Sequence, residues 1–453
     1  MLKFPKNFQI GASMSAMQTE GRGTTKIGKL TMDTYFEEHP QLFHNQVGPE
    51  LTSDITNHYV EDIGLFKEIG LDSLRTGFSW ARLFPDGVTL NQEAVEYYHK
   101  FIQEFKKQNI KIFMTLFHFD MPMWAHELGG WSSNEVIEKF VNYCNFVFQE
   151  FENEVDYYVT FNEPLVTVFE GYTGVMHYPA INEPKLAAQQ AYGIFLAHAK
   201  VVQSFRKFQL KAPIGVVYNW NFTFPFSQSQ ADIKAARIYD AYVNRGPLNI
   251  MANGTIDPVL IQTLKDYQVL PKYTPEELEI IKAVKVDFLG INYYFPCRVK
   301  SIASTNPSWV LETMKIEIPK TAKINPYRGW EIYPQGLYDI SMAIKTEFNN
   351  IPWYVAENGM GVENEDQYRG SDGVINDDYR IEYLQDHMGQ IKKGLDNGSS
   401  CFGYHIWTAI DCWSFRNAYK NRYGLIEVNL KDQSRKLKKS AYWYQELIKN
   451  KDK

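Results

Sequence analysis

The chain has 453 residues, of which 44% are hydrophobic and 22% are charged, so it can bury a large core and is not intrinsically disordered. Its 47 Lys and Arg against 53 Asp and Glu give a net charge of -6. This balance offers no general basic surface and argues against nucleic acid or an anionic membrane as a partner. Length alone suggests about three domains. Because no linker interrupts the chain, we instead expect one domain over residues 1–453.

Strand-like runs alternate with helical runs from end to end, which predicts βα units around a parallel sheet. Asn91 and the pair Ser132 and Glu135 are expected to cap two of the helices. Long connections at 295–330 and 360–378 follow the sixth and seventh strands and are expected to border a pocket. The predicted strands are 8–13, 73–80, 111–117, 157–161, 213–220, 287–294, 353–357 and 402–407. Eight such strands predict an α/β fold, a single (β/α)8 TIM barrel.

One of the predicted strands ends on a glutamate, and another is followed by one two residues later. The first ends on Glu357, after which Asn358 and Gly359 turn the chain, and the second is followed by Glu163, where Pro164 stops the extended run. A single Glu at a strand end is usually a surface residue or a helix cap. The carboxyl ends of parallel barrel strands share one face, however, so this pair could face each other across a pocket.

The sequence Thr-Phe-Asn-Glu-Pro around Glu163, followed by Glu-Asn-Gly at Glu357, resembles the catalytic signature of glycoside hydrolase family 1. Members of that family are retaining β-glycosidases built on a TIM barrel, and the resemblance covers nearly the whole chain. It implies Glu163 as the acid/base and Glu357 as the nucleophile, about 5 Å apart. Burial and the negative neighbour are expected to raise the pKa of Glu163. Arg75 and Asn292 are implied as support for the nucleophile, with Arg75 keeping it ionised, although the residue alone also fits a structural ion pair.

The resemblance also implies a set of sugar-binding residues, because sugar hydroxyls need side chains that donate and accept hydrogen bonds in fixed geometry. Tyr294 would also donate to the nucleophile, and Trp407 would form a platform under the sugar. Taken singly, His118 also fits a core histidine and Trp407 also fits plain packing. The implied set is Gln18, His118, Asn162, Tyr294 and Trp407.

The segment from Trp407 to Gly424 departs from the family members that hydrolyse neutral β-glucosides. Those enzymes carry Glu and Trp where this chain has Ser414 and Phe415, and the Glu grips the far hydroxyls of the sugar. The branch that acts on 6-phosphorylated sugars carries Ser there, with Lys seven residues on and Tyr nine residues on. Ser414 and Tyr423 match that branch. The physical reason is that a phosphate brings about -1.5 to -2 charges, which a carboxylate at that position would repel.

Two features conflict with the phosphosugar branch. Asn421 stands where the branch has its lysine, which leaves Lys420 and Arg422 as candidate phosphate cations, and Arg422 is common to both branches. The motif Thr-Phe-Asn-Glu-Pro is more typical of the enzymes that act on neutral sugars. The predicted function is a retaining 6-phospho-β-glycosidase. Because Phe415 stands where the galactose-type branch often has Trp, both the glucose and the galactose configuration of the substrate stay open. A neutral β-glucosidase and a non-catalytic carbohydrate-binding barrel are the alternatives.

Neither a metal nor another cofactor is expected, because the sequence has no His-Glu-x-x-His, paired-cysteine, calcium-loop or phosphate-loop motif. Cys144, Cys297, Cys401 and Cys412 are scattered without disulfide or metal spacing, which indicates buried thiols in a reducing compartment. The sequence shows no signal peptide or transmembrane run, so we expect a cytoplasmic location. The expected partner is a small β-glycoside, with no nucleic acid or membrane, and the oligomeric state stays open.

Overall fold

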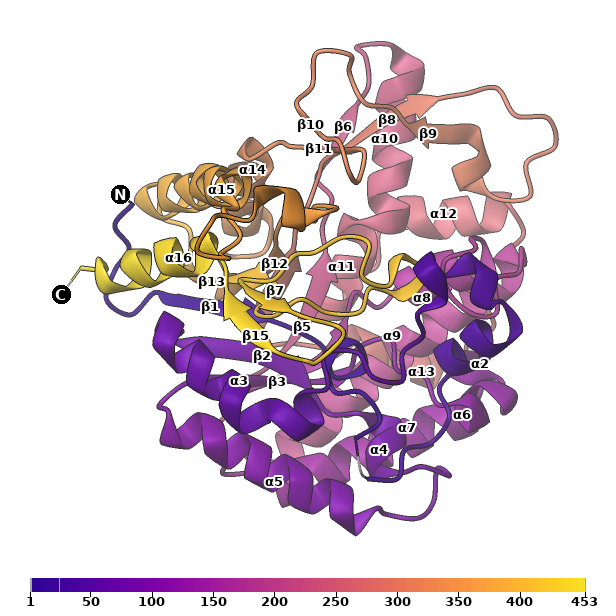
Figure 1. Ribbon diagram of the computed structural model, residues 1–453. Coiled ribbons are helices and arrows are strands. Elements are labelled where there is room, and N and C mark those ends of the chain that lie inside the picture. The colour runs from indigo at the N-terminus through magenta and orange to yellow at the C-terminus, as the bar shows by residue number, and fades with distance from the viewer. Residues whose placement is uncertain (1, 24, 453) are drawn as a thin grey trace.

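Parallel strands form a closed barrel at the centre of the structure (Figure 1). The computed structural model describes residues 2–23 and 25–452, and in that part of the chain eight strands pair side by side around the barrel. They are β1 (Gln9–Ser13), β2 (Ser73–Gly77), β3 (Lys111–Phe117), β4 (Tyr157–Asn162), β5 (Ile214–Asn219), β7 (Phe288–Asn292), β12 (Trp353–Asn358) and β13 (Cys401–Trp407). They follow one another in this order, and β13 closes the ring on β1. The predicted (β/α)8 barrel is therefore confirmed.

Helices surround the barrel (Figure 1). On α5 the side chains of Val95, Tyr98, Ile102 and Phe105 are all buried, as the helical spacing of these apolar residues predicts. No helix among residues 2–23 and 25–452 is both long and apolar enough to cross a bilayer. The helices are α1 (Ala16–Thr19), α2 (Thr31–Glu38), α3 (Ile55–Ile69), α4 (Trp80–Leu83), α5 (Gln92–Lys107), α6 (Met123–Glu127), α7 (Asn134–Glu150), α8 (Val166–Tyr172), α9 (Pro184–Phe208), α10 (Gln230–Val243), α11 (Arg245–Asn253), α12 (Pro258–Asp266), α13 (Pro275–Lys282), α14 (Gln335–Glu347), α15 (Asp378–Asp396) and α16 (Lys439–Lys449).

Some predicted boundaries and caps are wrong. The second strand ends at Gly77 rather than residue 80, because Trp80 begins the short helix α4. Asn91 precedes α5 as expected, but its amide donates to the carbonyls of two earlier segments instead of capping the helix. The capping box at Ser132 does not form, because this residue closes a 3₁₀ turn and its hydroxyl donates to the carbonyl of Gly129 at 2.7 Å.

Two apolar layers hold the barrel. Inside it, Phe113, Val159, Val217, Phe288 and Tyr354 pack against one another from five different strands. Outside it, a second and larger cluster fills the space between the strands and the helices. Fully burying one such side chain contributes about 1.5–3 kcal/mol relative to leaving it exposed. The strands are therefore fixed from both sides, and the positions of their carboxyl ends are fixed with them.

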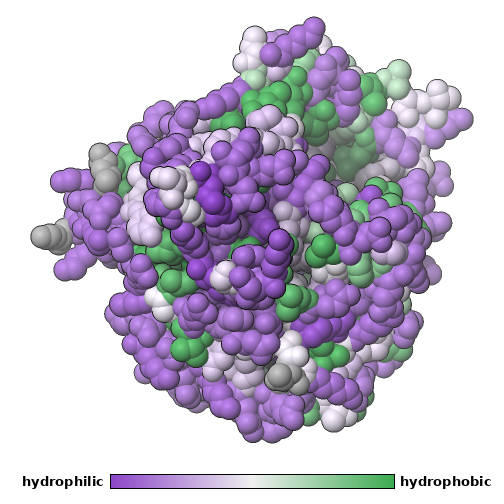
Figure 2. Space-filling model, in the orientation of Figure 1, coloured by the Kyte–Doolittle hydropathy of each residue, from purple (hydrophilic) through white to green (hydrophobic). Residues whose placement is uncertain are grey.

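The connection over residues 295–330 contains more structure than the sequence predicts. It contributes β8 (Cys297–Ser301) and β9 (Met314–Ile316) to a three-stranded sheet with β6 (Thr223–Pro225). It then enters a hairpin formed by β10 (Ile324–Asn325) and β11 (Trp330–Glu331). The sheet and the hairpin project at the top of Figure 1. Figure 2 shows a mostly hydrophilic face whose hydrophobic side chains gather near this sheet and in a hollow beside it.

Buried ion pairs anchor the loops that follow β12 and β13. Arg380 contacts both Glu365 and Asp377, and Lys438 contacts both Glu365 and Asp411. All five side chains are at least 95% buried. Breaking such a network leaves an uncompensated buried charge. The network ties the loop over 360–378 to the loop that precedes β14 (Ile426–Val428), which pairs with β15 (Arg435–Leu437).

Candidate active site

The two predicted glutamates lie at the carboxyl ends of their strands. Glu163 follows β4, and its backbone N–H donates to the carbonyl of Val217 on β5 at 2.9 Å. Its φ of 44° lies in the left-handed region, which is unfavourable for a residue with a side chain. Glu357 is the fifth residue of β12 and is paired in register with Asn292 of β7. The closure of the barrel thus brings two acids 194 positions apart to one end.

A shared set of donors links the two carboxyls. Arg75, from β2, forms an ion pair with Glu357 and donates to Oδ1 of Asn162 at 2.6 Å. Tyr294 donates its hydroxyl to Oε2 of Glu357 at 2.7 Å, as expected from the sequence. Asn292, which we expected to support Glu357, donates to Oε1 of Glu163 at 2.8 Å and also lowers the pKa of Glu357 by hydrogen bonding. One amide therefore serves both acids.

The two acids have different environments. Burial, and then the charge of Glu357, raise the pKa of Glu163 to about 8, which confirms the direction predicted from the sequence. Burial also raises the pKa of Glu357 above its usual range, but Arg75 and Tyr294 oppose this rise. Arg75 thus favours the ionised form of Glu357 without cancelling the effect of burial. Near neutral pH the arrangement favours a proton on Glu163 rather than on Glu357.

Three predicted sugar ligands lie next to this pair. His118 is 6% exposed, its Nε2 is 2.9 Å from Nδ2 of Asn162, and its Nδ1 has no partner among the described residues. Burial and the charge of Arg75 lower the pKa of His118, so the imidazole is neutral. The ring of Trp407, at the end of β13, is 6.0 Å from the imidazole. These side chains can therefore offer a sugar hydroxyl-binding groups and an aromatic face.

Gln18 connects the first strand region to the loop after β13. It lies on α1, accepts from the hydroxyl of Ser15 at 2.8 Å and donates to the carbonyl of Trp413 at 2.9 Å. This contact fixes the segment that carries Ser414. The hydroxyl of Ser414 makes no hydrogen bond to any described residue, so it is available to a ligand.

Phe415 and Tyr423 lie in two different clusters. The ring of Phe415 is 5.7 Å from Phe119 and 4.8 Å from His177, in an aromatic cluster beside α2. Tyr423 packs with Trp407 and Tyr294, beside the acids. Of the two, Tyr423 therefore has the contacts that place it near the two glutamates.

Both candidate cations from the sequence are engaged with carboxylates. Lys420 lies 3.3 Å from Glu363, and Arg422 lies 3.5 Å from Asp411 with its guanidinium stacked over the ring of Tyr419. They line a cavity of about 360 Å³ that none of the predicted sugar ligands lines. The structure does not bring these two charges to the ring of predicted sugar ligands.

Comparison with known proteins identifies the family. The model of glycosyl hydrolase family 1 matches residues 1–453. The chain belongs to this family. It is 40% identical to the 6-phospho-beta-glucosidase GmuD of Bacillus subtilis, over 99% of this chain and 98% of that protein. It is 32% identical to the 6-phospho-beta-galactosidase of Staphylococcus aureus, over 99% and 98%. The family 1 β-glucosidase from Thermotoga maritima superposes with a TM-score of 0.91 at 28% identity, over 99% and 98%. The protein is thus a retaining β-glycosidase that acts on a small-molecule glycoside.

Two residues near Tyr294 in this family 1 site were not singled out by the sequence analysis. Trp330, on β11, has its ring 5.5 Å from the ring of Tyr294. Arg328, in the turn of the same hairpin, has its guanidinium 4.2 Å from the centre of the Trp330 ring. No motif marks either residue, because the loop that carries them belongs to no repeated pattern in the chain.

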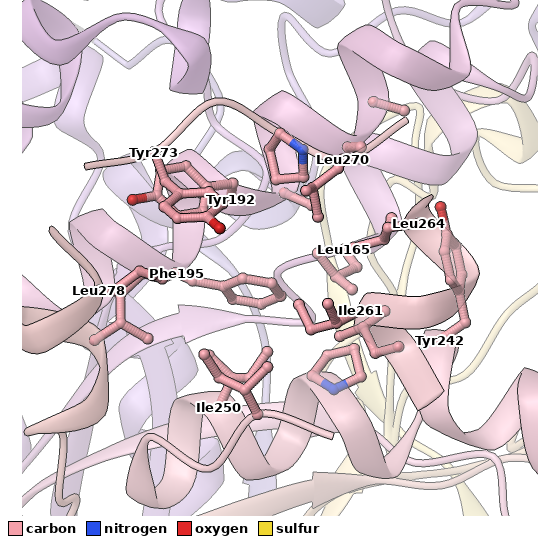
Figure 3. A pocket seen from close by; sticks show the side chains of 18 of the residues that line it. Leu165, Tyr192, Phe195, Tyr242, Ile250, Ile261, Leu264, Leu270, Tyr273 and Leu278 are labelled. Carbon is pink, nitrogen blue, oxygen red and sulfur yellow. The ribbon is translucent and has the colours of Figure 1, made fainter. Parts of the chain in front are cut away.

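A separate apolar cavity of about 260 Å³ lies beside the family 1 barrel (Figure 3). Side chains including Leu165, Phe195 and Leu264 point into it from α9, α12 and the start of α8. None of the described residues that line it is charged. With no acid and no cation in its wall, the cavity lacks the groups that glycoside hydrolysis requires. All four cysteines are buried free thiols, as predicted, and no described group of three or more potential ligands could hold a metal ion.

Proposed function

We propose that this family 1 enzyme hydrolyses 6-phospho-β-glycosides, with Glu357 as nucleophile and Glu163 as acid/base. The observation that carries the phosphosugar assignment is Ser414, with its free hydroxyl, at the position where neutral-sugar enzymes hold a carboxylate. The similarity to GmuD over nearly the full length supports the same assignment. Tyr423, packed between Trp407 and Tyr294, supplies a second hydroxyl-bearing side chain at the same end of the site.

In the first step, Glu163 protonates the glycosidic oxygen while Glu357 attacks the anomeric carbon. Its raised pKa of about 8 keeps Glu163 largely protonated at pH 7, ready to donate. Arg75 and Tyr294 hold the carboxylate of Glu357 and favour its ionised form. The bond to the leaving group breaks, the alcohol departs with the proton, and a covalent ester joins the sugar to Glu357.

In the second step, Glu163 acts as a base. Once Glu357 is esterified its negative charge is gone, and that charge is the second largest cause of the raised pKa of Glu163. The pKa of Glu163 therefore falls, and its carboxylate accepts a proton from water. The water oxygen attacks the anomeric carbon, the ester breaks, and Glu357 regains its charge. Two displacements at one carbon return the original β configuration.

A β-glucosidase for neutral sugars is the second candidate. It is supported by Asn421, which stands where the phosphosugar branch has lysine, and by the close likeness to the Thermotoga maritima β-glucosidase. In that case Ser414 would only change how the outer hydroxyls are held. A non-catalytic carbohydrate-binding barrel is disfavoured, because both acids and their donors are in place.

Comparing 4-nitrophenyl β-D-glucoside with its 6-phosphate tests the proposal. We expect kcat/KM to favour the phosphorylated substrate by about 100-fold or more, since several charged hydrogen bonds are added. The galactoside pair, with and without phosphate, tests the sugar configuration in the same assay. A clear preference for the unphosphorylated compounds contradicts the phosphosugar assignment and leaves the neutral β-glucosidase. Absence of hydrolysis of all four by the folded protein favours the binding barrel.

A further inference from the structure

A phosphosugar site needs a cation, and the two predicted from the sequence are engaged elsewhere. A phosphate carries about -1.5 to -2 charges at pH 7, so hydroxyl groups alone hold it poorly. Lys420 and Arg422 are paired with Glu363 and Asp411 on a different cavity. The position of the branch lysine holds Asn421, which is neutral. The charge must therefore come from another segment of the chain.

Arg328 meets this need by its position. Nη1 of Arg328 lies 3.4 Å from Oδ1 of Asn421, the residue that replaces the lysine. The face of the guanidinium rests on Trp330, whose ring lies 5.5 Å from the ring of Tyr294. Tyr294 in turn donates to Glu357. A short chain of contacts thus runs from the predicted nucleophile to this arginine.

The positive charge of Arg328 also acts on Tyr423. Burial raises the pKa of Tyr423, and the charge of Arg328 is the largest influence that opposes the rise. Tyr423 and Asn421 both belong to the segment that in the phosphosugar branch supplies the Lys and Tyr. Arg328 therefore approaches that segment from the hairpin that follows β7, two strands away from β13 around the barrel.

Unlike Arg75 and Arg380, Arg328 forms no ion pair with any described carboxylate. Arg75 pairs with Glu357 and Arg380 with Glu365, whereas the one hydrogen bond of the Arg328 side chain is the long contact to Asn421. Its Nε is buried without a partner among residues 2–23 and 25–452, and so is Nδ2 of Asn421. Buried donors without a partner are rare in folded proteins and call for a ligand or water. The two side chains that carry these donors meet through the contact of Nη1 with Oδ1, and each donor requires an acceptor.

The hairpin that carries Arg328 is firmly held. Asn325 of β10 donates to the carbonyl of Gly361 at 3.0 Å, and Glu331 of β11 forms a two-pronged ion pair with Arg298. A Cβ on Gly361 would lie 2.4 Å from the Tyr423 ring, so the absence of a side chain lets this loop close on Tyr423. The hairpin is thereby fastened to the loop that contacts Tyr423, and the arginine is pre-positioned before substrate arrives.

We propose that Arg328 is the phosphate-binding cation of this enzyme and takes the place of the lysine that Asn421 replaces. This inference rests on the proposed function, because it identifies the residue that recognises the 6-phosphate. A guanidinium stacked on an aromatic face keeps its N–H edge free, and that edge matches two phosphate oxygens. Nδ2 of Asn421 then donates to the same group, with the hydroxyls of Ser414 and Tyr423 as further ligands.

The test compares Arg328→Met with wild type on 4-nitrophenyl 6-phospho-β-D-glucoside and on the neutral glucoside. We expect kcat/KM for the phosphorylated substrate to fall by about 10- to 100-fold, the range for charged hydrogen bonds, and to change little for the neutral one. The loss should lie mainly in KM, because the phosphate is remote from the reacting carbon. Arg328→Lys should recover part of the loss. The matched control is Lys323→Met, which removes an exposed cation five positions before Arg328 that pairs with Glu382. It should leave kcat/KM unchanged for both substrates.

A rescue variant makes the inference sharper. Adding Asn421→Lys to Arg328→Met restores the lysine of the branch and should restore preference for the phosphorylated substrate. Equal losses on both substrates in Arg328→Met, or a wild-type ratio, overturn the role of Arg328 and leave the phosphosugar assignment intact. Competitive inhibition of the wild type tests the phosphosugar assignment itself. If the enzyme binds glucose 6-phosphate no better than glucose, both proposals are overturned.

Discussion

The two ends of the sugar site are built in opposite ways. At the acid end, each carboxylate already has its donors: Glu357 has Arg75 and Tyr294, and Glu163 has Asn292. At the outer end, in the part of the chain that the structure describes, Arg328 pairs with no carboxylate and the amide nitrogen of Asn421 has no partner. The acid end carries its counter-charges within the protein, because its chemistry is the same for every substrate. The outer end lacks a counter-charge, and we infer that the substrate brings it.

Removing the nucleophile is the largest change available at the acid end. We expect Glu357→Gln to lower kcat by about four orders of magnitude or more, the scale found when a covalent nucleophile is lost. The loss should be equal for phosphorylated and neutral substrates, because both react at the same carbon. Steady-state kinetics on both aryl glucosides measure it. Glu382→Gln, at a side chain 65% exposed on α15, is the matched control; activity near wild type in Glu357→Gln would refute the assignment.

Removing the acid/base has the next largest effect and gives a pH signature. Because Glu163 must carry a proton in the first step, kcat/KM of the wild type should fall as pH rises through about 8, the pKa of Glu163. Glu163→Gln should lower kcat/KM by about 100- to 10,000-fold for poor leaving groups and remove this alkaline limb. A strongly acidic leaving group such as 2,4-dinitrophenol needs little protonation in the first step. For a substrate with this leaving group, the loss of kcat/KM in Glu163→Gln should be smaller. An unchanged alkaline limb in Glu163→Gln would assign the titration to another group.

The two catalytic acids of the proposed mechanism could be predicted from the sequence, whereas Arg328 could not. Glu163 and Glu357 lie at the ends of apolar strands in recognisable motifs, and the alternation of strands and helices predicted all eight barrel strands to within a few residues. The 295–330 connection carries no such periodicity, so its strands β8 and β9 and its hairpin went unpredicted. The Arg328–Asn421 contact spans 93 positions between two loops. Local pattern does not encode that kind of contact.

A carboxylate at position 414 should invert the behaviour of the outer end. Ser414→Glu introduces the residue type of neutral-sugar enzymes, and its charge repels a 6-phosphate. We expect kcat/KM for the phosphorylated glucoside to fall by about 100-fold, since like charges brought together cost several kcal/mol. Activity on the neutral glucoside should hold or rise, and the ratio of the two measures the switch. Ser414→Gln, which has similar size and no charge, is the control; equal losses in both variants would point to sterics instead of charge.

Replacing Arg422 should have the smallest effect on substrate specificity, because its charge stabilises the loop instead of binding the substrate. Arg422→Met removes the ion pair to Asp411 and should lower the free energy of unfolding by about 1–3 kcal/mol. The ratio of kcat/KM for phosphorylated over neutral substrate should stay within about threefold of wild type, the size of a weak exposed charge effect. Thermal or urea unfolding and the paired kinetic assay measure the two quantities. A collapse of the ratio in a fully stable variant would return the phosphate cation to Arg422.

The most direct measurement traps the covalent intermediate from a competing mixture. The protein is incubated with equal amounts of an activated 2-deoxy-2-fluoro-β-glucoside and its 6-phosphate, digested, and analysed by mass spectrometry. We predict a fluorinated phosphosugar ester on the peptide that contains Glu357. A neutral fluorosugar on that peptide would contradict the phosphosugar assignment, and a label on any other carboxylate would contradict the catalytic one.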